Sequence, residues 1–549
     1  MADRIELNPV EKLTQTQVKR MTAVHGWAGT ILGLVLYVVI VSGTIVVFGH
    51  EISEWSSGGT RVHQELSDMS NLDGNVRAIA EHTSKGYLDR ITMFTNSRGE
   101  LAVFPHTQVM HPEDQRPKAY GSLYNLDPAT GETIRRFDGF AFDDEESHHT
   151  SALEDFLVEL HVALYVPNPW GSILTGIMGL LVMATAITGF LMHRHLFRDL
   201  FVAARRGERL VTTRDRHILA ASWSLIFAFL LGFTGSFYSF AGTVTFPLVS
   251  KAAFGGDRQA MINTMFMPPT KIDTTPAPVA DLDRMVAQSV ERMGGSVRFV
   301  QILNWGRADG RMRIFHTPND GGLAFGQTIF RTSDGKFLGE KPIVGSEPSL
   351  GADLYGLIHP LHFGDFAGVF SKSVWVGLGT AMAYVIISGL RLWVRRREDE
   401  VLWQHFGRAV TITGFGLPLA MLASAWAYFP ALAFGDPFFW TPIGFFAGAA
   451  AIILFGALSD ADRLIPRLLR LLSVGCLALP ILRLGFGGTG WVDAADLNLG
   501  AVPALDMVFA LIGVGLWFWA SRTDAATNDR AGAAGNTGGI GHSTMEPAE

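Results

Sequence analysis

Residues 355–397 read YGLIHPLHFGDFAGVFSKSVWVGLGTAMAYVIISGLRLWVRRR, and the interpretation of the whole chain depends on this stretch. Two histidines, His359 and His362, precede an apolar run at 366–393 that ends in a basic cluster. An apolar run of this length can cross a bilayer as a helix. An ionisable side chain at membrane depth is costly to desolvate. Histidines at the start of such a helix therefore indicate a functional site whose partner lies elsewhere in the chain.

The composition is that of a polytopic membrane protein. The chain has 549 residues, of which 48% are hydrophobic, and its formal net charge is -7. Basic residues crowd short segments and acidic residues crowd two long polar ones, which indicates membrane topology and gives no support for a nucleic-acid partner. The single cysteine, Cys476, excludes intrachain disulfides, thiolate zinc sites and cysteine-ligated iron–sulfur clusters. A redox cofactor would therefore need histidine or methionine ligands.

Eight apolar runs are long enough to span a membrane. Four of them lie at 25–48, 171–193, 217–241 and 366–393, and four more follow within 411–520, at 411–434, 440–459, 464–483 and 500–520. The basic loop 194–216 and the loop 394–410 are expected in the cytoplasm, together with the N-terminus (1–24) and a disordered tail (521–549). The long polar segments 49–170 and 242–365 then lie outside, in the periplasm of a bacterium.

The first four spans and the two polar segments form an internal repeat. His25 and His217 open the first and third spans, and each precedes a glycine, Gly43 or Gly235, by eighteen residues. Each polar segment reads as one helix followed by strands, with an Asp/Gly turn before the last strand, as in LYNLDPATGETI (123–134) and TIFRTSDGKFLGE (328–340). The fold class is therefore a duplicated four-helix bundle with two small α+β domains inserted outside the membrane.

The repeat also relates two further histidines. His161 and His362 each stand fifteen residues before a glycine of the second and fourth spans. Alternating helix direction places His25 and His217 near the inner face, and His161 and His362 near the outer face. Neutral imidazole is a good iron ligand, and bundle cores are a usual place for haem. We therefore predict two bis-histidine haems, because four histidines at matched positions outweigh the ordinary reading of one histidine as an interfacial residue.

Other residues are secondary candidates. His193 ends the second span, and His50 and His359 lie near the outer face, where each would replace or assist a ligand. Arg194, Arg214 and Arg216 would pair with haem propionates, or they reflect topology alone. Six small residues would let a flat macrocycle approach the helices, or would serve close helix packing: Gly29, Gly33, Gly176, Gly179, Gly377 and Gly379.

Four motifs occur in order: His25-x-Trp27-x-Gly29, D-P-x-T-G-E at 127–132, L-H-F-G at 361–364 and S-G-L-R-L-W at 388–393. Over about residues 20–400 they resemble the PepSY-associated transmembrane family, in the branch of iron-regulated inner-membrane proteins and ferric-siderophore reductases. The resemblance implies PepSY-like outside domains. It also implies b-type haem held by the four repeat-matched histidines and reduction of a periplasmic ferric siderophore. The helices within 411–520 depart from shorter family members.

The sequence thus predicts a transmembrane oxidoreductase of the bacterial inner membrane that reduces a ferric chelate for iron acquisition. No Gly-rich dinucleotide fingerprint occurs, so a quinol or a partner protein is expected as the electron donor. One alternative is a non-redox PepSY protein that binds or regulates a peptidase. Another is a siderophore or metal transporter built on the repeat, which the scarcity of charges within 411–520 disfavours.

Overall fold

The computed structural model describes residues 14–56, 66, 69, 71–96, 99–112, 117–144, 151–192, 209–267, 270–317, 323, 326–345 and 347–537. The chain divides into two compact units, which are described separately below. The first unit comprises residues 1–44, 160–240 and 374–414, and the second comprises 45–159, 241–373 and 415–549. Within the described ranges, eight helices are long and apolar enough to cross a membrane, which confirms the predicted number.

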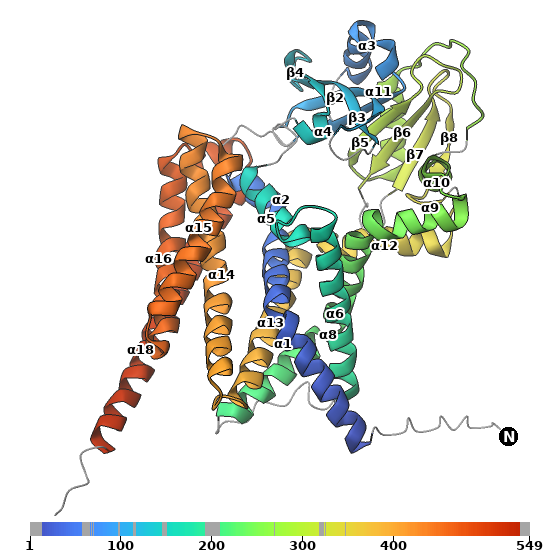
Figure 1. Cartoon of the computed structure of the whole chain (residues 1–549). Coiled ribbons are helices and arrows are strands. Elements are labelled where there is room, and N and C mark those ends of the chain that lie inside the picture. Colours follow the sequence, from blue (N-terminus) through green and yellow to red (C-terminus); the bar gives the residue numbers. More distant parts are fainter. Residues whose placement is uncertain are drawn as a thin grey trace, which may run out of the picture. The chain divides into compact units, whose positions relative to one another are not determined.

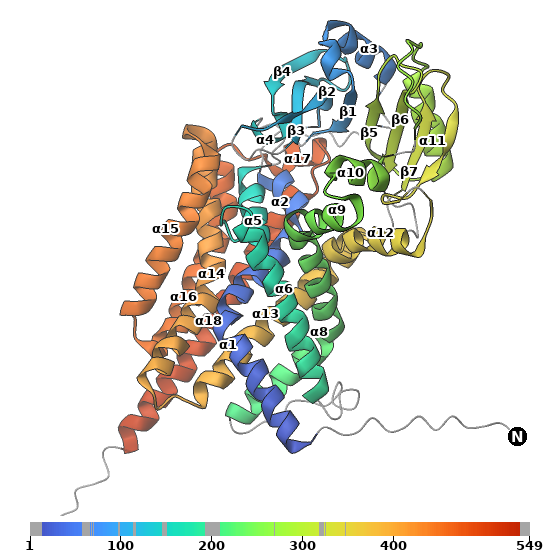
Figure 2. The ribbon, with the colours of Figure 1, turned by 45° about the vertical axis from the view of Figure 1, so that its right-hand side comes forward.

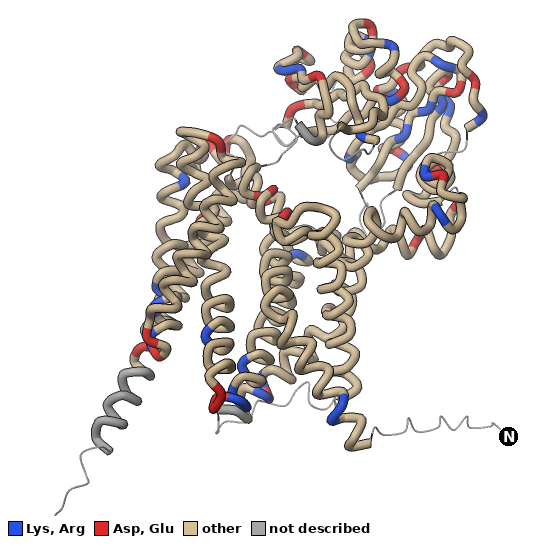
Figure 3. The backbone as a smooth tube through the Cα atoms, viewed as in Figure 1, with Lys and Arg blue, Asp and Glu red and all other residues tan. Residues whose placement is uncertain are grey.

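The first unit is a bundle of four long helices (Figures 1 and 2): α1 (Gln15–Val46), α6 (Trp170–Met192), α8 (Arg209–Phe240) and most of α13 (Gly368–Arg395). All four contribute to one apolar core, in which Leu36, Met178, Phe227 and Met382 are buried. In Figure 3 these helices carry few charges along their length, and charged residues gather where α13 ends and α14 begins. This distribution is expected of helices whose middle turns face lipid.

Several helices are longer than the apolar runs that revealed them, among them α18 (Ala501–Thr537), which continues into the tail that we expected to be disordered. Helix α1 begins at Gln15, ten residues before the predicted span, and α8 begins at Arg209. Beyond its apolar run α8 continues through a π-helical segment, η4 (Ala241–Thr245), into α9 (Phe246–Phe254). A helix satisfies its own backbone hydrogen bonds in water as well as in lipid, so apolar side chains mark only the part that crosses the bilayer.

His161 and His362 lie on short helices that precede the second and fourth spanning helices. His161 lies on α5 (Ala152–Ala163) and His362 on α12 (Leu350–Phe363). Leu164 and Tyr165 have φ of 54° and 56°, which ends α5 before α6 begins. Gly364 caps α12 at φ 68°. Residues with positive φ cannot continue a right-handed helix, and this physical break is invisible in the hydrophobic pattern.

In the second unit, each of the two long polar segments contains the predicted helix followed by strands, with helix 72–82 before four strands in the first half and helix 282–293 before four strands in the second. The first half contains α3 (Leu72–His82), η2 (Lys85–Tyr87), β1 (Arg90–Thr95), β2 (Leu101–Met110), β3 (Pro117–Leu126), β4 (Thr133–Gly139) and α4 (Ala141–Asp144). The second half contains α10 (Arg258–Phe266), α11 (Leu282–Met293), β5 (Val297–Leu303), β6 (Arg311–His316), β7 (Gly326–Arg331) and β8 (Phe337–Lys341).

The two predicted Asp/Gly turns are present. Asp127 accepts hydrogen bonds from the backbone N–H groups of Ala129 and Thr130, and Gly131 has φ 73°. In the second half Gly335 has φ 69°. Aspartate and glycine are therefore required at these turns for side-chain capping and for a left-handed backbone, respectively.

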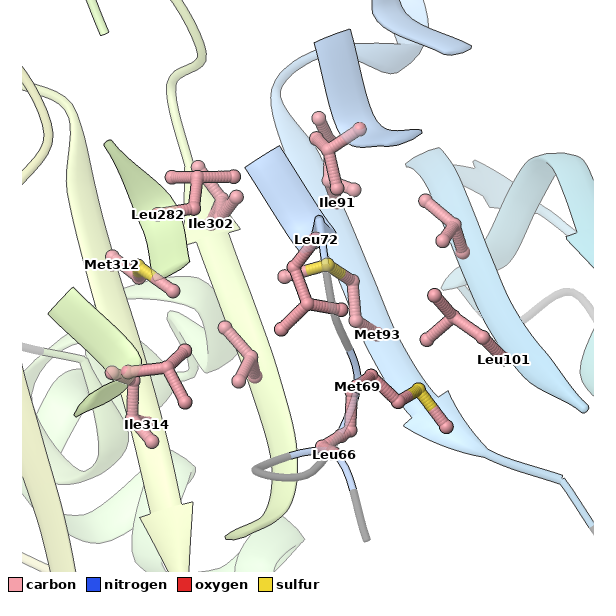
Figure 4. Packing of buried hydrophobic residues seen from close by; sticks show 14 of the residues in the cluster. Leu66, Met69, Leu72, Ile91, Met93, Leu101, Leu282, Ile302, Met312 and Ile314 are labelled. Carbon is pink, nitrogen blue, oxygen red and sulfur yellow. The ribbon is translucent and has the colours of Figure 1, made fainter. Parts of the chain in front are cut away.

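The two halves share one sheet, which the sequence did not predict. The strand order is β4-β3-β2-β1-β5-β6-β7-β8, and β1 and β5 pair antiparallel with Met93 opposite Val300. Figure 4 shows Leu72 and Ile91 of the first half meeting Leu282 and Ile302 of the second in a common core on one face. Pairing at this seam removes an exposed edge strand from each half.

The helices α3 and α11 cap each other across the seam. The backbone N–H of Leu72 donates to Asp283 Oδ1 over 2.9 Å, and the N–H of Leu282 donates to Asp73 Oδ1 over 3.2 Å. Each aspartate thus satisfies an N–H at the start of the other helix, which has no partner within its own helix. The exchange relates the halves by approximate twofold symmetry and fixes how they join.

The remaining helices of the second unit are α2 (Gly49–Ser56), most of α14 (Val401–Phe434), α15 (Pro437–Leu458), α16 (Ala461–Gly485), α17 (Trp491–Asp496) and α18 (Ala501–Thr537). A buried ion pair joins α16 to α18, with Arg483 Nη2 2.6 Å from Asp506 Oδ2. The indoles of Trp55 and Trp491 also donate to Asp506. These bonds satisfy the buried carboxylate and attach α2 to the C-terminal helices.

Replacing Asp283 with alanine tests whether the exchanged helix caps stabilise the pairing of the two halves. The change leaves the N–H groups of Leu72 and Asp73 without their acceptor, so we expect a loss of about 1–2 kcal/mol of local stability. Hydrogen exchange of the β1 and β5 amides in the full-length protein should become faster. Asp334→Ala, at a turn in the same half, should leave β1 exchange unchanged, and equal effects of the two variants would contradict the reciprocal cap.

Candidate functional site

A largely apolar cavity of about 400 Å³ lies inside the four-helix unit. Residues of α1, α6, α8 and α13 line it, and His25 and His217 are both in its wall. The volume falls within the range of about 300–1,000 Å³ that is usual for cofactor and small-molecule sites. The structure therefore brings together the two inner histidines that the repeat predicted as a pair.

The ring of His25 is held by a hydroxyl of α6. His25 Nδ1 lies 3.0 Å from Thr188 Oγ1, and that hydroxyl donates its own proton to the carbonyl of Ala184 at 2.8 Å. Thr188 must then accept from Nδ1–H. In a neutral imidazole with Nδ1 protonated, the lone pair is on Nε2.

His217 is held in the same way by α13. Its Nδ1 lies 3.0 Å from both the Val385 carbonyl and Ser388 Oγ. A carbonyl oxygen only accepts, so Nδ1 carries the proton and Nε2 the lone pair. Thr188 and Ser388 each precede a glycine, in Ile-Thr-Gly (187–189) and Ile-Ser-Gly (387–389). The repeat thus includes the residues that orient the histidines, a signal that we missed in the sequence.

The glycines of these two tripeptides make room for the imidazoles. A Cβ at Gly389 would lie 3.1 Å from His217 Cε1, and one at Gly189 would lie 3.8 Å from His25 Cε1. The contact at Gly389 is tighter than side chains normally tolerate. Larger residues at position 389 would therefore displace the ring.

His161 also belongs to the first unit, and α1 holds it. Its Nδ1 lies 3.0 Å from the Val39 carbonyl, so Nδ1 again donates and the lone pair is on Nε2. A Cβ at Gly43 would lie only 2.6 Å from His161 Cε1. The small-residue site eighteen residues after His25 is therefore the place where His161 packs on α1. Burial lowers the pKa of His161, which favours the neutral ring.

The other histidine candidates lie elsewhere. His362, His359 and His50 belong to the second unit, and His193 falls outside the described residues. His359 Nε2 is 3.4 Å from Asp365 Oδ2 and its ring lies against Phe363. Burial would raise the pKa of Asp365, but the contacts with His359 lower it. This contact commits Nε2 of His359 to the Asp365 carboxylate.

Two residues of the cavity wall beside α1 were not predicted. The Trp393 indole packs over Gly26, and its Nε1–H is buried without a hydrogen-bond partner among the described residues. Arg396 also lines the cavity. An unpartnered buried N–H and a cation at one wall suit the carboxylates of a bound group. Arg214 and Arg216 are not in the wall, and Arg194 falls outside the described residues.

Of the glycines noted in the sequence, some leave room in the cavity and others allow close helix packing. Gly29 and Gly33 line the cavity. Three others meet neighbouring helices: Gly176 faces Phe240, Gly179 faces Ser236 and Gly379 faces Thr44. Small residues thus allow close packing of α6 on α8 and of α13 on α1, while the first two leave space beside the histidines.

Residues 22–396 match the family model described as PepSY-associated TM region. This match covers more than half of the chain. The chain belongs to the PepSY-associated TM region family. The family region of this PepSY-associated protein includes the cavity and the sheet and ends before α14.

An uncharacterized protein of Pseudomonas aeruginosa is 28% identical to this PepSY-associated protein over 258 residues. The match covers 45% of this chain and 64% of that relative, which is less than two thirds of its length. The similarity thus assigns no activity to this chain.

Filling the cavity tests whether it holds a prosthetic group. A side chain at Gly29 meets no other atom within 4 Å of its Cβ, so Gly29→Leu should fold and span the membrane while occupying the cavity. We expect the purified variant to lose the share of its visible absorbance that a group in this cavity contributes. Gly377→Leu also adds a side chain in open space but outside the cavity wall, and it should keep the absorbance. Full absorbance in Gly29→Leu would contradict a cofactor in this cavity.

Proposed function

We propose that this protein is a haem b oxidoreductase that carries electrons across the bacterial inner membrane and reduces a ferric chelate, of the siderophore type, in the periplasm. The supporting observation is the cavity whose wall contains both His25 and His217, each with Nδ1–H committed to an oxygen of a neighbouring helix. Metal-ligating histidines characteristically donate the other ring N–H in this manner, which fixes the tautomer and the ring orientation.

The residues of the cavity fit a flat macrocycle. Gly29, Gly33 and Gly389 leave space beside the two imidazoles, and most of the wall is apolar and excludes water. Trp393 Nε1–H and Arg396 would hold the propionates. Among the described residues no cluster of three or more His, Cys, Asp or Glu could hold a bare metal ion, so an axial pair is the arrangement these histidines suit. Haem with two imidazole ligands supplies one-electron transfer.

His161 and His362 are proposed as the second pair. His161 has the features of the inner histidines, with Nδ1–H on the Val39 carbonyl and the ring against Gly43. The repeat makes His362 the counterpart of His161 in the second copy.

Electrons are proposed to enter from a quinol or a partner protein at the inner pair, as the basic loops orient the chain. The peptidase-binding and transporter alternatives need no cofactor and predict colourless protein. The buried pair of Arg483 and Asp506 does place charge within the last four helices, but the two groups bond to each other and to neighbours in the second unit. A substrate path therefore gains no support from that pair.

Histidine variants test the assignment. We expect purified wild-type protein in detergent to show b-type absorption bands, and His25→Ala and His217→Ala each to lose the share that belongs to the inner site. His405, exposed on α14 and outside the cavity, provides the control, and His405→Ala should retain the full spectrum. Unchanged spectra in the first two variants, or colourless wild-type protein, would refute the proposal.

A hydroxyl variant tests the tautomer argument. Thr188→Val keeps the side-chain shape but removes the acceptor of His25 Nδ1–H. The hydrogen bond raises the basicity of the imidazole, so its loss should raise the midpoint potential of the inner site by about 20–60 mV. A redox titration followed at the b-type bands measures this shift. Thr44→Val, outside the cavity wall, should leave the potential unchanged, and an unshifted potential in Thr188→Val would contradict the role of this hydroxyl.

A further inference from the structure

The face of the sheet opposite α3 and α11 carries a row of polar and positively charged side chains. Because alternate residues of a strand point to opposite faces, the buried Ile91, Met93 and Val300 place their neighbours on the other face. Cross-strand pairs join β2 to β1, β5 to β6 and β7 to β8 within this row. We call this set the cationic row, and it consists of His106, Arg90, Gln301, Arg313, Gln327 and Lys341.

Arg313 is central to the row and has no carboxylate partner among the residues that the structure describes. It is 5% exposed and donates to Gln327 Oε1, Gln301 Oε1 and the Phe266 carbonyl over 2.9–3.0 Å. All three acceptors are neutral. Its hydrogen bonds are therefore satisfied, while its charge is not balanced by an anion.

Two further cations, Lys341 and Arg90, add to the positive charge on this face of the sheet. Lys341 is 4% exposed and donates to the Pro342 carbonyl, and Arg90 is half-buried on β1. Within the described part of the chain no salt bridge involves Arg90, Arg313 or Lys341. Burial and the Arg313 charge lower the pKa of Lys341 to about 8, and burial and the Arg90 charge lower the pKa of Arg313 to about 10. Arg313 therefore repels both Arg90 and Lys341, at a cost that a bound anion would offset, and Asp89 compensates only Arg90.

His106 contributes an unused polar atom at the same place. It lies directly opposite Arg90 in the strand register, and its Nε2 is 3.1 Å from Thr92 Oγ1. Its Nδ1 is buried and has no hydrogen-bond partner among the described residues, although the residue is only 3% exposed. Buried polar atoms without partners are rare, and they commonly mark a place where a ligand or a water belongs.

The row is most accessible at the seam between the halves. The Phe142 ring lies over Phe104 beside His106 at one end, and Phe266 and Met267 contact Arg313 at the other. Arg90, Thr92 and Gln301, at the pairing of β1 with β5, are only partly buried. A ligand would therefore meet Arg90 first.

We propose that the cationic row binds an anionic metal chelate over the β1–β5 seam, with Arg90 as its first contact. The metal part of this inference rests on the proposed ferric reductase function, whereas the preference for negative charge rests on the row alone. Guanidinium and ammonium groups recognise carboxylate and catecholate oxygens by charge-assisted hydrogen bonds. A chelate with net positive charge would be repelled by the three cations.

Binding of redox-inert gallium chelates to the full-length protein in detergent tests the proposal. Gallium(III) citrate serves as the anionic probe and gallium(III) desferrioxamine B as the cationic one, with affinities measured by calorimetry. We expect citrate chelate binding that weakens as ionic strength rises, and at least about tenfold weaker binding of the cationic probe. Arg90→Gln and Lys341→Met should each weaken citrate chelate binding about tenfold.

Two control variants separate the effect of positive charge in the row from other effects of substitution. Arg90→Lys retains the charge at a partly exposed position and should bind within about threefold of wild type. Arg136→Gln removes a cation of β4 that is already paired with Asp138 and should bind like wild type. Equal affinity for the two probes, or wild-type binding by Arg90→Gln, would overturn the proposal. Because gallium is not reduced, absence of haem from the protein would refute the proposed function without changing this result.

Discussion

Burial of imidazole N–H groups among apolar helices is the constraint on which the membrane part of this protein depends. A buried donor without an acceptor costs about 1–3 kcal/mol. His25, His217 and His161 each meet this requirement through Nδ1 and an oxygen of a neighbouring helix. The consequence is chemical as well as structural, since every ring is left with its lone pair on Nε2. Helix packing thereby fixes both the orientation and the tautomer of the rings.

The two copies of the repeat have different roles in the four-helix unit and in the sheet. In the four-helix unit, the two copies supply one histidine each to a shared cavity, with Thr188 and Ser388 in equivalent roles. In the sheet, the two copies join through β1 and β5 and through the exchanged caps of Asp73 and Asp283. Because the halves are joined in this way, Arg90 of the first half lies on the same face of the sheet as Arg313 and Lys341 of the second.

Much of this arrangement was predictable because it depends on local pattern. Hydropathy located the eight spans, and the repeat paired His25 with His217 before any geometry was known. The same comparison, extended to Thr188 and Ser388, would have found the orienting hydroxyls. The breaks before α6 and α13 depend on a few φ angles and were missed, as was the joining of β1 to β5, because edge pairing between distant segments leaves no periodic signal.

Electron paramagnetic resonance of the oxidised, purified wild-type protein tests the central claim most directly, because it reports the axial ligands of ferric haem. Two neutral imidazoles at one iron should give a low-spin ferric spectrum, and replacing either His25 or His217 should convert the inner share to high-spin or abolish it. A wholly high-spin spectrum, or no ferric haem signal from pure, folded protein, would contradict bis-histidine ligation in this cavity.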